Sequence, residues 1–343
     1  MRHLKPFSLF FALLLVCTGC ASSKPVQHQC FAMDTFMTFT LYGRQAQTAA
    51  AQAEDYIIQL EDSISVTRPD SDLAQLAQAG GEWTEVSEET FRLLSTAKEL
   101  CRQTEGILDI TAYPAVKAWG FTTGEYRVPG DDELAELTER IDWSAIELDP
   151  EQNAVRLPVG MSLDLGAVAK GWAGDVLAQL LAENGIESAV LSLGGNIQAV
   201  GKKPDGSLWR VGIQDPFSQQ GAYLGTLEVE DKAVVTSGGY ERYFEQDGKH
   251  YCHIIDPDSA APAQSGLASV TIIGESGTVC DALSTALFIM GSEDAARFWR
   301  TSPHEFEYIL ILEDGSIHIT QGLEHSFTLM QDSQEQKVTV IAP

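Results

Sequence analysis

Basic residues are scarce in this chain of 343 residues, which has 22 Lys and Arg against 49 Asp and Glu and a formal net charge of −27. A surface this acidic repels nucleic acids and anionic lipids, so the composition disfavours both as partners. An anionic ligand would therefore have to be bound by a few well-placed cations or by a metal ion.

Cysteine and histidine are also few, with six and seven residues in the chain. The four cysteines beyond residue 20 are widely spaced and form no C-x-x-C pair, and the histidines show no zinc-binding spacing. These absences exclude a disulfide-stabilised scaffold and a zinc centre. Cys101 and Cys280 lie among apolar residues at helical spacing, so we expect both to be buried, although one disulfide could still form.

The N-terminus contains an apolar run of ten residues, Phe7–Val16, which is too short to span a bilayer as a helix. It follows Arg2 and Lys5 and precedes a C-T-G-C sequence that ends at Cys20. This order is typical of a bacterial lipoprotein signal peptide, in which Cys20 becomes the lipidated residue. Because Cys17 stands where Leu is usual, a plain secretory signal cleaved nearby is the alternative.

Either interpretation predicts an exported protein, and acylation of Cys20 would anchor it at the bacterial cell envelope, in the periplasm or on the outer face of the cytoplasmic membrane. Residues 1–20 are then the signal peptide, residues 21–29 a short tether, and residues 30–343 one domain. Without the signal peptide the chain keeps 20 basic and all 49 acidic residues, which makes its net charge −29.

Residues 30–343 show no linker, repeat or low-complexity tract, and their apolar periodicity alternates between helix and strand spacing. We therefore predict the α+β class, as a single large mixed α/β domain or as two intimately joined lobes. Helices are expected over residues 48–60, 72–79, 88–102, 131–140, 167–183 and 279–290, the last capped by Thr278. Strands are expected over residues 31–42, 146–148, 155–157, 162–165, 188–193, 209–214, 223–229, 233–237, 240–244, 250–255, 269–273, 308–312 and 316–320.

The chain is organised around residues 162–196, which read as strand, turn, helix, turn and strand. Asp164 would end the first strand, and Lys170 would lie in the first turn of the helix. The start of that helix offers N–H donors and a positive dipole end to a phosphate. Gly194-Gly195 would let the backbone approach a ligand closely. An ordinary β-α-β unit with glycine-rich corners is the alternative interpretation.

Asp281 and Thr285 are four residues apart in the last expected helix, so both project from one face that is otherwise apolar. A carboxylate and a hydroxyl on one face can share a hard cation, which prefers oxygen ligands. In the alternative interpretation, Asp281 interacts with the helix dipole and Thr285 bonds back to a main-chain carbonyl.

Eight stretches resemble, in the same order, motifs of the ApbE family, the flavin transferases that move FMN from FAD onto proteins. They cover nearly all of the chain after the signal peptide, which makes the resemblance highly specific. The stretches are Met33–Met37 (MDTFM), Pro69–Leu73 (PDSDL), Gly106–Thr111 (GILDIT), Leu163–Gly171 (LDLGAVAKG), Leu191–Asn196 (LSLGGN), Thr236–Phe244 (TSGGYERYF), His253–Pro257 (HIIDP) and Cys280–Leu287 (CDALSTAL).

The resemblance implies a Mg²⁺ ion held by Asp281, Thr285 and the main-chain carbonyl of Ala167. It also implies that Lys170 and Asp164 belong to the flavin site. Further positions that it places along the FAD pocket are Met33, Thr67, Ile107, Leu108, Asp109, Gly194, Gly195, Asn196 and Ile255. Two positions depart from the family pattern: Thr67 stands where an aromatic residue often packs on a ring, and Ser259-Ala260 replaces the usual Thr-Gly.

The residue types suit cleavage of the FAD pyrophosphate by a protein hydroxyl, which gives an FMN phosphodiester on Thr or Ser and releases AMP. Asp281 would hold the metal ion, and Lys170 would add a positive charge beside it. His253 is the candidate base for the acceptor hydroxyl because the titration range of histidine suits that task. A purely structural hydrogen-bonding role is the alternative for His253.

By resemblance, the acceptor would be an exported FMN-carrying protein with a motif like Asp-Gly-x-Ser/Ala-Gly-Ala-Thr, whose Thr takes the FMN. Two other functions stay open: a Mg²⁺-dependent FAD pyrophosphatase that uses water and yields FMN and AMP, and a lipoprotein that binds FAD without turnover. The Asp281/Thr285 pair argues against simple binding, because capture needs no cation at a scissile phosphate.

Overall fold

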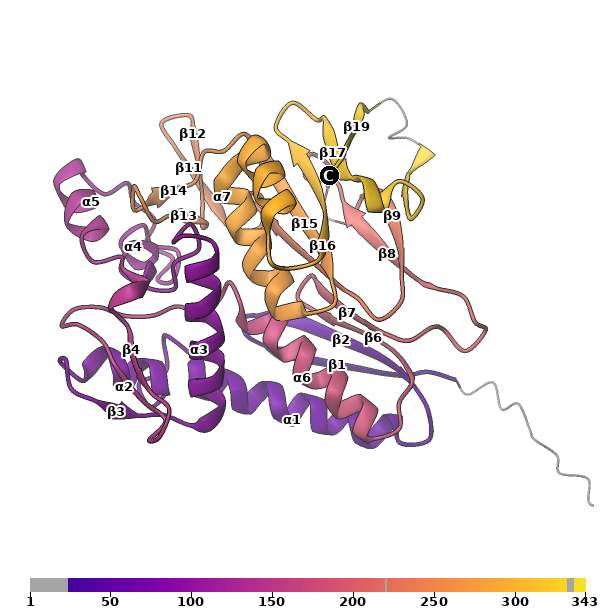
Figure 1. Cartoon of the computed structure of the whole chain (residues 1–343), viewed down its shortest axis with the longest axis horizontal. Helices are drawn as coiled ribbons and strands as arrows, with labels where there is room; N and C mark the ends of the chain where they lie inside the picture. The colour runs from indigo at the N-terminus through magenta and orange to yellow at the C-terminus, as the bar shows by residue number, and fades with distance from the viewer. Residues whose placement is uncertain (1–23, 220, 332–335) are drawn as a thin grey trace, which may run out of the picture.

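The computed structural model describes residues 24–219, 221–331 and 336–343. Its main feature is a nine-stranded sheet in the order β1-β2-β6-β7-β10-β15-β16-β17-β19 (Figure 1). Neighbouring strands are antiparallel except β17 and β19, which are parallel. The strands are β1 Val26–Ala32, β2 Thr35–Tyr42, β6 Ser188–Leu193, β7 Asn196–Val200, β10 Ala233–Gly238, β15 Leu267–Gly274, β16 Phe306–Leu312, β17 Ile317–Thr320 and β19 Val338–Ile341.

Three helices cover one face of this sheet: α1 (Ala46–Ile64), α6 (Ala169–Glu183) and α7 (Gly277–Thr301). Their buried faces join the inward-facing side chains of β2 and β6 in the largest apolar core. Helix α7 runs across the middle of the sheet, and its helical backbone is interrupted at Gly291, where φ is 76°. The N-terminal turns of α6 and α7 meet above the centre of the sheet, which places Lys170 and Asp281 close together.

A second layer covers the opposite face of the large sheet. It is a three-stranded sheet in the order β18-β9-β8, formed by β8 (Trp209–Gln214), β9 (Tyr223–Val229) and β18 (Phe327–Leu329). Its apolar residues pack with the outward face of β10, β15, β16 and β17 in a separate core. Burial on both faces explains the nearly continuous apolar runs of β15 and β16.

The remaining elements form a smaller region beside the helices, on the left of Figure 1. It contains the helices α2 (Asp72–Gln78), α3 (Glu88–Gln103), α4 (Tyr113–Ala118) and α5 (Asp131–Thr138), a 3₁₀ turn (Trp143–Ala145), and the small sheet β3 (Thr84–Glu85), β4 (Glu147–Asp149) and β5 (Ala154–Arg156). Two short hairpins lie above it: β11 (Tyr243–Gln246) with β12 (Lys249–Cys252), and β13 (Ile255–Asp256) with β14 (Ala261–Pro262). A last 3₁₀ turn covers Gln321–Leu323.

The predicted α+β class is confirmed, and each predicted helix has a counterpart. Two local predictions are wrong. Residues 162–165 form no strand. The Asp164 N–H donates to the carbonyl of Ile110 at 2.8 Å, and the Leu165 carbonyl accepts from the turn that begins α6, so the segment pairs with no strand among the described residues. The cap of α7 is Ser276, whose hydroxyl accepts from the Val279 N–H, and Thr278 lies inside the first turn.

The N-terminal predictions fall mostly outside the described residues, since the signal peptide and Cys20 precede residue 24. Residues 26–29, which the sequence assigns to a tether, belong to β1 and pair with β2. The four cysteines after residue 20 are buried and free, as expected for Cys101 and Cys280. Within the described ranges, no helix has both the length and the apolar character to cross a membrane.

Candidate active site

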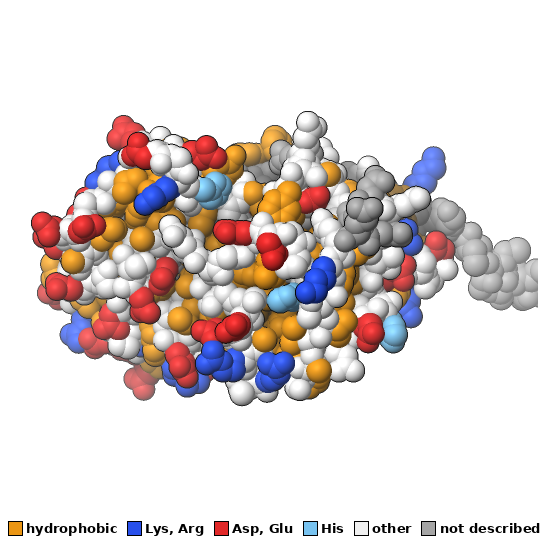
Figure 2. Space-filling view, turned by 90° about the horizontal axis from the view of Figure 1, so that it is seen from above, with side chains coloured by type: hydrophobic (Ala, Val, Ile, Leu, Met, Phe, Trp, Pro, Cys, Tyr) orange, Lys and Arg blue, Asp and Glu red, His pale blue; other side chains and the backbone are white. Residues whose placement is uncertain are grey.

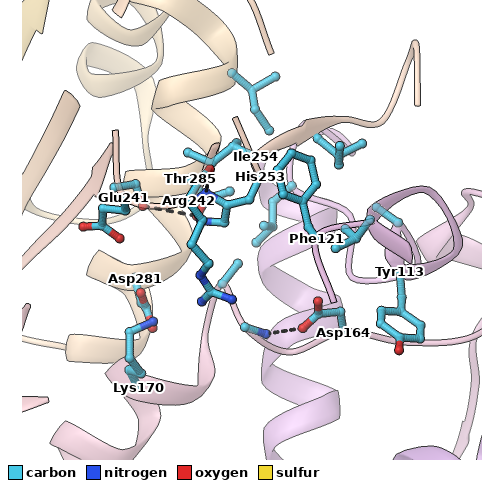
Figure 3. Close-up of a pocket in the computed structure, with 18 of the residues that line it drawn as sticks. Tyr113, Phe121, Asp164, Lys170, Glu241, Arg242, His253, Ile254, Asp281 and Thr285 are labelled. Carbon is cyan, nitrogen blue, oxygen red and sulfur yellow. Dashed lines mark hydrogen bonds between the residues drawn. The ribbon is translucent and has the colours of Figure 1, made fainter. Parts of the chain in front are cut away.

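A cavity of about 260 Å³ lies where the N-terminal turns of α6 and α7 meet the loop before α4 and the hairpins above it (Figure 3). It brings together most of the residues that the sequence singles out, although they come from five separate stretches of the chain. The predicted residues that line it are Ile107, Leu108, Asp109, Asp164, Ala167, Lys170, Gly194, Asn196, His253, Ile255, Asp281 and Thr285.

The close crossing of α6 and α7 depends on two glycines. A Cβ at Gly171 would lie 2.5 Å from the carbonyl carbon of Gly277 and 2.8 Å from the Cβ of Asp281, where real contacts are almost never below 3.0 Å. Gly277 in turn faces the carbonyl oxygen of Gly171. Because neither helix has a side chain at the crossing, the Gly171 N–H can donate to the Asp281 carboxylate at 2.8 Å.

This hydrogen bond corrects one expectation from the sequence. The N–H groups at the start of α6 were expected to be open to a phosphate, but Gly171 uses its N–H on a carboxylate of the protein itself. A negative charge at a helix N-terminus is stabilised by the helix dipole, so Asp281 occupies the position that an anion would take. The Gly171 N–H is therefore not available to the phosphate of a ligand.

Asp175 of α6 fixes the start of α7 from the side. Its carboxylate accepts hydrogen bonds from the Ser276 hydroxyl at 2.9 Å, the Gly277 N–H at 2.6 Å, and the Thr278 N–H and hydroxyl at 2.9 and 2.7 Å. These bonds satisfy the N–H groups that a helix start leaves unpaired. They set the orientation of α7 one turn before Asp281.

Asp281 and Thr285 both face the cavity from α7, and Ala167 lines it from the turn before α6. Asp281 is only 3% exposed, and no Lys or Arg nitrogen in the described ranges lies within 4.0 Å of its carboxylate. The Thr285 hydroxyl lies 3.5 Å from the Ser237 hydroxyl. The bond back to a main-chain carbonyl, which the alternative interpretation assigns to Thr285, is absent among the described residues. A buried carboxylate, a hydroxyl and a nearby carbonyl oxygen fit a hard divalent cation.

No cluster of three or more His, Cys, Asp or Glu side chains is found in the described part of the chain. The oxygen set around Asp281 contains one carboxylate only, so it would leave several positions on a metal ion open to water or to phosphate oxygens.

Asp164 and Lys170 both line the cavity and lie on opposite sides of the Arg242 guanidinium group (Figure 3). The Gly166 N–H donates to Asp164 at 2.7 Å. Burial raises the pKa of Asp164 above its usual range, while this hydrogen bond and the positive charges of Arg242 and Lys170 act in the opposite direction. Lys170 forms no ion pair among the described residues, so its ammonium group is available to a ligand.

His253 contacts the backbone of Arg242 twice. The backbone N–H of His253 donates to the Arg242 carbonyl oxygen at 3.0 Å, and the imidazole Nδ1 of His253 lies 3.3 Å from the same oxygen. Burial lowers the pKa of His253 to about 4, and the charges of Arg242 and Lys170 contribute to the decrease. The imidazole is therefore neutral at pH 7, so it can accept a proton, and it also holds the segment that carries Arg242.

Asp109 lines the cavity, but its carboxylate is used within the protein. It accepts from the Thr111 N–H and hydroxyl at 2.8 and 2.7 Å and from the Trp143 N–H at 3.0 Å. Burial raises the pKa of Asp109 despite these hydrogen bonds. Asp109 thus holds the loop before α4 in place, and the neighbouring Ile107 and Leu108 supply apolar lining.

A second cavity of about 440 Å³ adjoins the first and shares Val66, Phe121, Thr122, Asp164, Gly166, Lys170 and Arg242 with it. Met33 and Thr67, predicted for the FAD pocket, line only this outer cavity. Phe31 also lines it and is 59% exposed. The cavity thus has an exposed aromatic ring at Phe31, although position 67 has none.

The turn between β6 and β7 supplies Gly194 and Asn196 to the inner cavity, while Gly195 is exposed and lines neither cavity. Gly194 has a φ of +64° and lies against Thr35, so a side chain there would clash as well as strain the backbone. Asn196 is 4% exposed, and its side-chain nitrogen has no hydrogen-bond partner among the residues that the structure describes. A buried donor of this kind is suited to an oxygen of a ligand.

Sequence reasoning missed Arg242 and Asp175 as individual residues. Arg242 stands within the TSGGYERYF stretch, so the motif was seen but the cation was not singled out. Asp175 could have been noticed in the sequence as a carboxylate within a largely apolar helical stretch. Figure 2 shows how widely Asp and Glu side chains are spread over one face of the molecule. In a chain this acidic, a basic side chain in the cleft is a stronger indication of an anion-binding site.

These features define a mixed α/β domain with a polar cleft, in which carboxylate and hydroxyl side chains lie near two cations at the crossing of two helices. The model of the ApbE family matches residues 33–310, and the chain belongs to that family.

Similar proteins agree over most of the chain. A protein of Vibrio cholerae named FAD:protein FMN transferase is 37% identical over 254 residues, which are 72% of this chain and 75% of that protein. One of the same name from Treponema pallidum is 33% identical over 326 residues, 90% of each. The crystal structure of the ApbE protein of Thermotoga maritima has a TM-score of 0.81 at 30% identity, covering 87% of this chain and 97% of that one.

Proposed function

We propose that this protein transfers FMN from FAD to a Thr or Ser hydroxyl of an acceptor protein, in a Mg²⁺-dependent reaction that releases AMP. Membership of the ApbE family and similarity to proteins named FAD:protein FMN transferase support flavin transfer. The observation that carries the proposal is the single cavity that gathers Asp281, Thr285 and Ala167 with Lys170 and His253.

The Asp281 carboxylate, the Thr285 hydroxyl and the Ala167 carbonyl would hold the Mg²⁺ ion, because all three supply hard oxygen ligands. When bound, the ion would offset the charge of the pyrophosphate and polarise the bond that breaks. The cleft needs such compensation, since Asp164, Glu241 and Asp281 all line it and the whole chain carries a net charge of −27.

In the transfer step, the acceptor hydroxyl oxygen bonds to the phosphorus of the FMN half, and the bond from that phosphorus to the bridging oxygen breaks. AMP leaves with the bridging oxygen, and the hydroxyl proton passes to a base. His253 is the candidate base because it lines the cavity and its imidazole is neutral at pH 7. Its pKa, lowered to about 4, makes it a weaker base than an ordinary histidine. Lys170 supplies positive charge that orients the pyrophosphate.

The experiment combines the purified full-length protein with FAD, Mg²⁺ and a small acceptor domain that carries the motif Asp-Gly-x-Ser/Ala-Gly-Ala-Thr. Flavin fluorescence on a denaturing gel reports covalent transfer, and chromatography reports AMP. A fluorescent acceptor with matching AMP supports the transferase. AMP and free FMN with a dark acceptor would instead indicate a pyrophosphatase, and bound FAD with neither product would indicate a binding protein. An acceptor with Ala in place of the motif Thr is the control.

The proposal includes export and lipid anchoring through Cys20, supported by the basic and apolar residues before it. The acceptor would then also be an exported protein. Cell fractionation tests this part: the wild-type protein should be found with membranes, and Cys20→Ser should not be processed to a lipidated form. A cytosolic wild-type protein would contradict it.

A further inference from the structure

Lys170 and Arg242 are the only Lys or Arg side chains that line the two adjoining cavities within the described ranges. Both residues line both cavities, so both lie where the cavities join. Figure 3 shows the Arg242 guanidinium group directed into the space between Lys170 and Asp164. The junction therefore carries both of the basic side chains that the described part of the cleft offers, beside the carboxylate of Asp164.

Arg242 has no ion-pair partner within 4.0 Å among the described residues, although the chain has 49 acidic residues and pairs many of its cations on the surface. Its backbone is held firmly, because the Arg242 carbonyl accepts from the His253 N–H at 3.0 Å. The guanidinium thus projects from a fixed segment without being neutralised by a neighbour. Such an arrangement suits an anion supplied by a ligand.

We propose that Arg242 binds the pyrophosphate of FAD where the two cavities join, so that one ring system lies in each cavity. The inference rests on the proposed function, which makes FAD the substrate. A guanidinium group presents several N–H donors in one plane and can bind two phosphate oxygens at once, whereas Lys170 contributes a single charged point. Arg242 would therefore fix the orientation of the two phosphorus atoms, and Lys170 would add charge.

The geometry also explains why a dinucleotide is favoured over either half alone. The inner cavity of about 260 Å³ and the outer cavity of about 440 Å³ meet at Lys170 and Arg242, so the middle of a ligand that occupies both cavities lies beside these two cations. A ligand with a ring at each end and two negative charges in the middle matches this arrangement.

The test compares FAD with riboflavin, which has the same ring system and no phosphate, using equilibrium titrations of the full-length protein in EDTA to prevent turnover. Arg242→Ala should weaken FAD binding about 10- to 100-fold, the range expected for a lost charge-assisted hydrogen bond, and change riboflavin binding less than 3-fold. Arg242→Lys should be intermediate. Added KCl should weaken FAD binding more in the wild type than in Arg242→Ala.

Arg44→Ala is the matched control, because it removes the same charge from an exposed residue that lines neither cavity. Its neighbour Gly43 lies near Gly185 and Ile186, after the C-terminal end of α6. It should bind FAD like the wild type. Equal FAD affinities of Arg242→Ala and Arg44→Ala would overturn the inference, and so would an equal loss of FAD and riboflavin, which would indicate a distorted cavity. Wild-type protein that binds FAD but transfers no FMN would contradict the proposed function alone.

Discussion

Replacing Gly171 by Ala should damage both the stability and the catalytic site of this protein. The added Cβ would lie 2.5 Å from the Gly277 carbonyl carbon and 2.8 Å from the Asp281 Cβ. Bringing the first of these contacts to 3.0 Å requires α6 and α7 to separate by roughly half an ångström or more. The bond from the Gly171 N–H to Asp281, now 2.8 Å, would lengthen or break.

The magnitude follows from three terms. Overpacking of a close contact costs about 1–3 kcal/mol. Weakening a hydrogen bond to a buried carboxylate costs about 1.5–3 kcal/mol if the bond is lost. Ala gains up to about 1 kcal/mol over Gly in a helix. We expect a net loss of about 2–4 kcal/mol in the free energy of unfolding, because the favourable propensity offsets part of the two costs.

Gly174→Ala is the matched control on the same helix. An added Cβ at position 174 would meet the Gln198 side-chain oxygen at 3.3 Å and nothing closer, so it can be accommodated by a small adjustment. The same gain in helix propensity then acts almost alone, and the variant should be unchanged or stabilised by up to about 1 kcal/mol. Comparing the two variants separates the helix crossing from the general effect of Gly→Ala.

Urea unfolding followed by far-UV circular dichroism measures the stability of both variants, and FMN transfer at saturating FAD measures kcat. A displacement approaching 1 Å of a group that holds the reacting atoms can reduce the rate about 100-fold, so Gly171→Ala should lose one to two orders of magnitude in kcat even where it stays folded. Equal urea midpoints and equal kcat for the two variants would refute the argument that this crossing positions Asp281.

Three further predictions concern other groups in the site. Asp281→Ala should abolish Mg²⁺-dependent AMP release but keep FAD binding in EDTA, and an active variant would exclude Asp281 as a metal ligand. Asp175→Ala should lower the free energy of unfolding by about 1–3 kcal/mol and weaken Mg²⁺ binding, and Asp175→Asn should restore part of both. A free energy of unfolding equal to that of the wild type would contradict the role of Asp175 at the start of α7. Because the pKa of His253 is lowered to about 4 from about 6.5 when unfolded, the unfolded chain binds the proton first as pH falls. The free energy of unfolding should therefore decrease as the pH falls from 6.5 to 4. The rate of FMN transfer should not change between pH 5 and 8 through titration of this group. The variant His253→Gln should lack the decrease in kcat/KM at acidic pH.

The sequence predicted strands best where burial alternates along them. The bounds of β6, β8 and β9 agree with the predicted ranges 188–193, 209–214 and 223–229. Alternating exposure leaves a period-two pattern that can be read locally. Residues 162–165 have a similar pattern but pair only with the loop at Ile110, and no local signal distinguishes a loop partner from a strand partner.

The error at the start of α7 has the same origin. Thr278 looks like a cap because it precedes an apolar helical run, but its hydroxyl donates to Asp175, which lies 103 positions away in the chain. The cap function then falls to Ser276. Which of the neighbouring Ser and Thr residues caps α7 depends on a contact between α6 and α7. This contact cannot be predicted from the sequence of either helix alone.

Most residues of the candidate site could be predicted because their motifs match those of a family. Their division between the inner and the outer cavity could not be predicted. Met33 and Thr67 lie in the outer cavity and Ile107 to Asp109 in the inner one, a division with no trace in the linear order of the motifs. Asp109 shows the limit of motif matching, since its carboxylate is engaged by Thr111 and Trp143. A matched residue can thus shape the site without presenting its polar group to the ligand.

The crossing of α6 and α7 would allow one carboxylate to serve as the core of the proposed metal site in so acidic a protein. One Asp281 oxygen is fixed by a backbone N–H at 2.8 Å, and no cationic side chain in the described ranges neutralises the group. Its orientation therefore comes from the backbone of α6, and its negative charge is left for a ligand. A Lys or Arg partner would have oriented Asp281 equally well, but it would have competed with a metal ion for the same oxygens. Two glycines at the crossing are the feature that permits orientation without neutralisation.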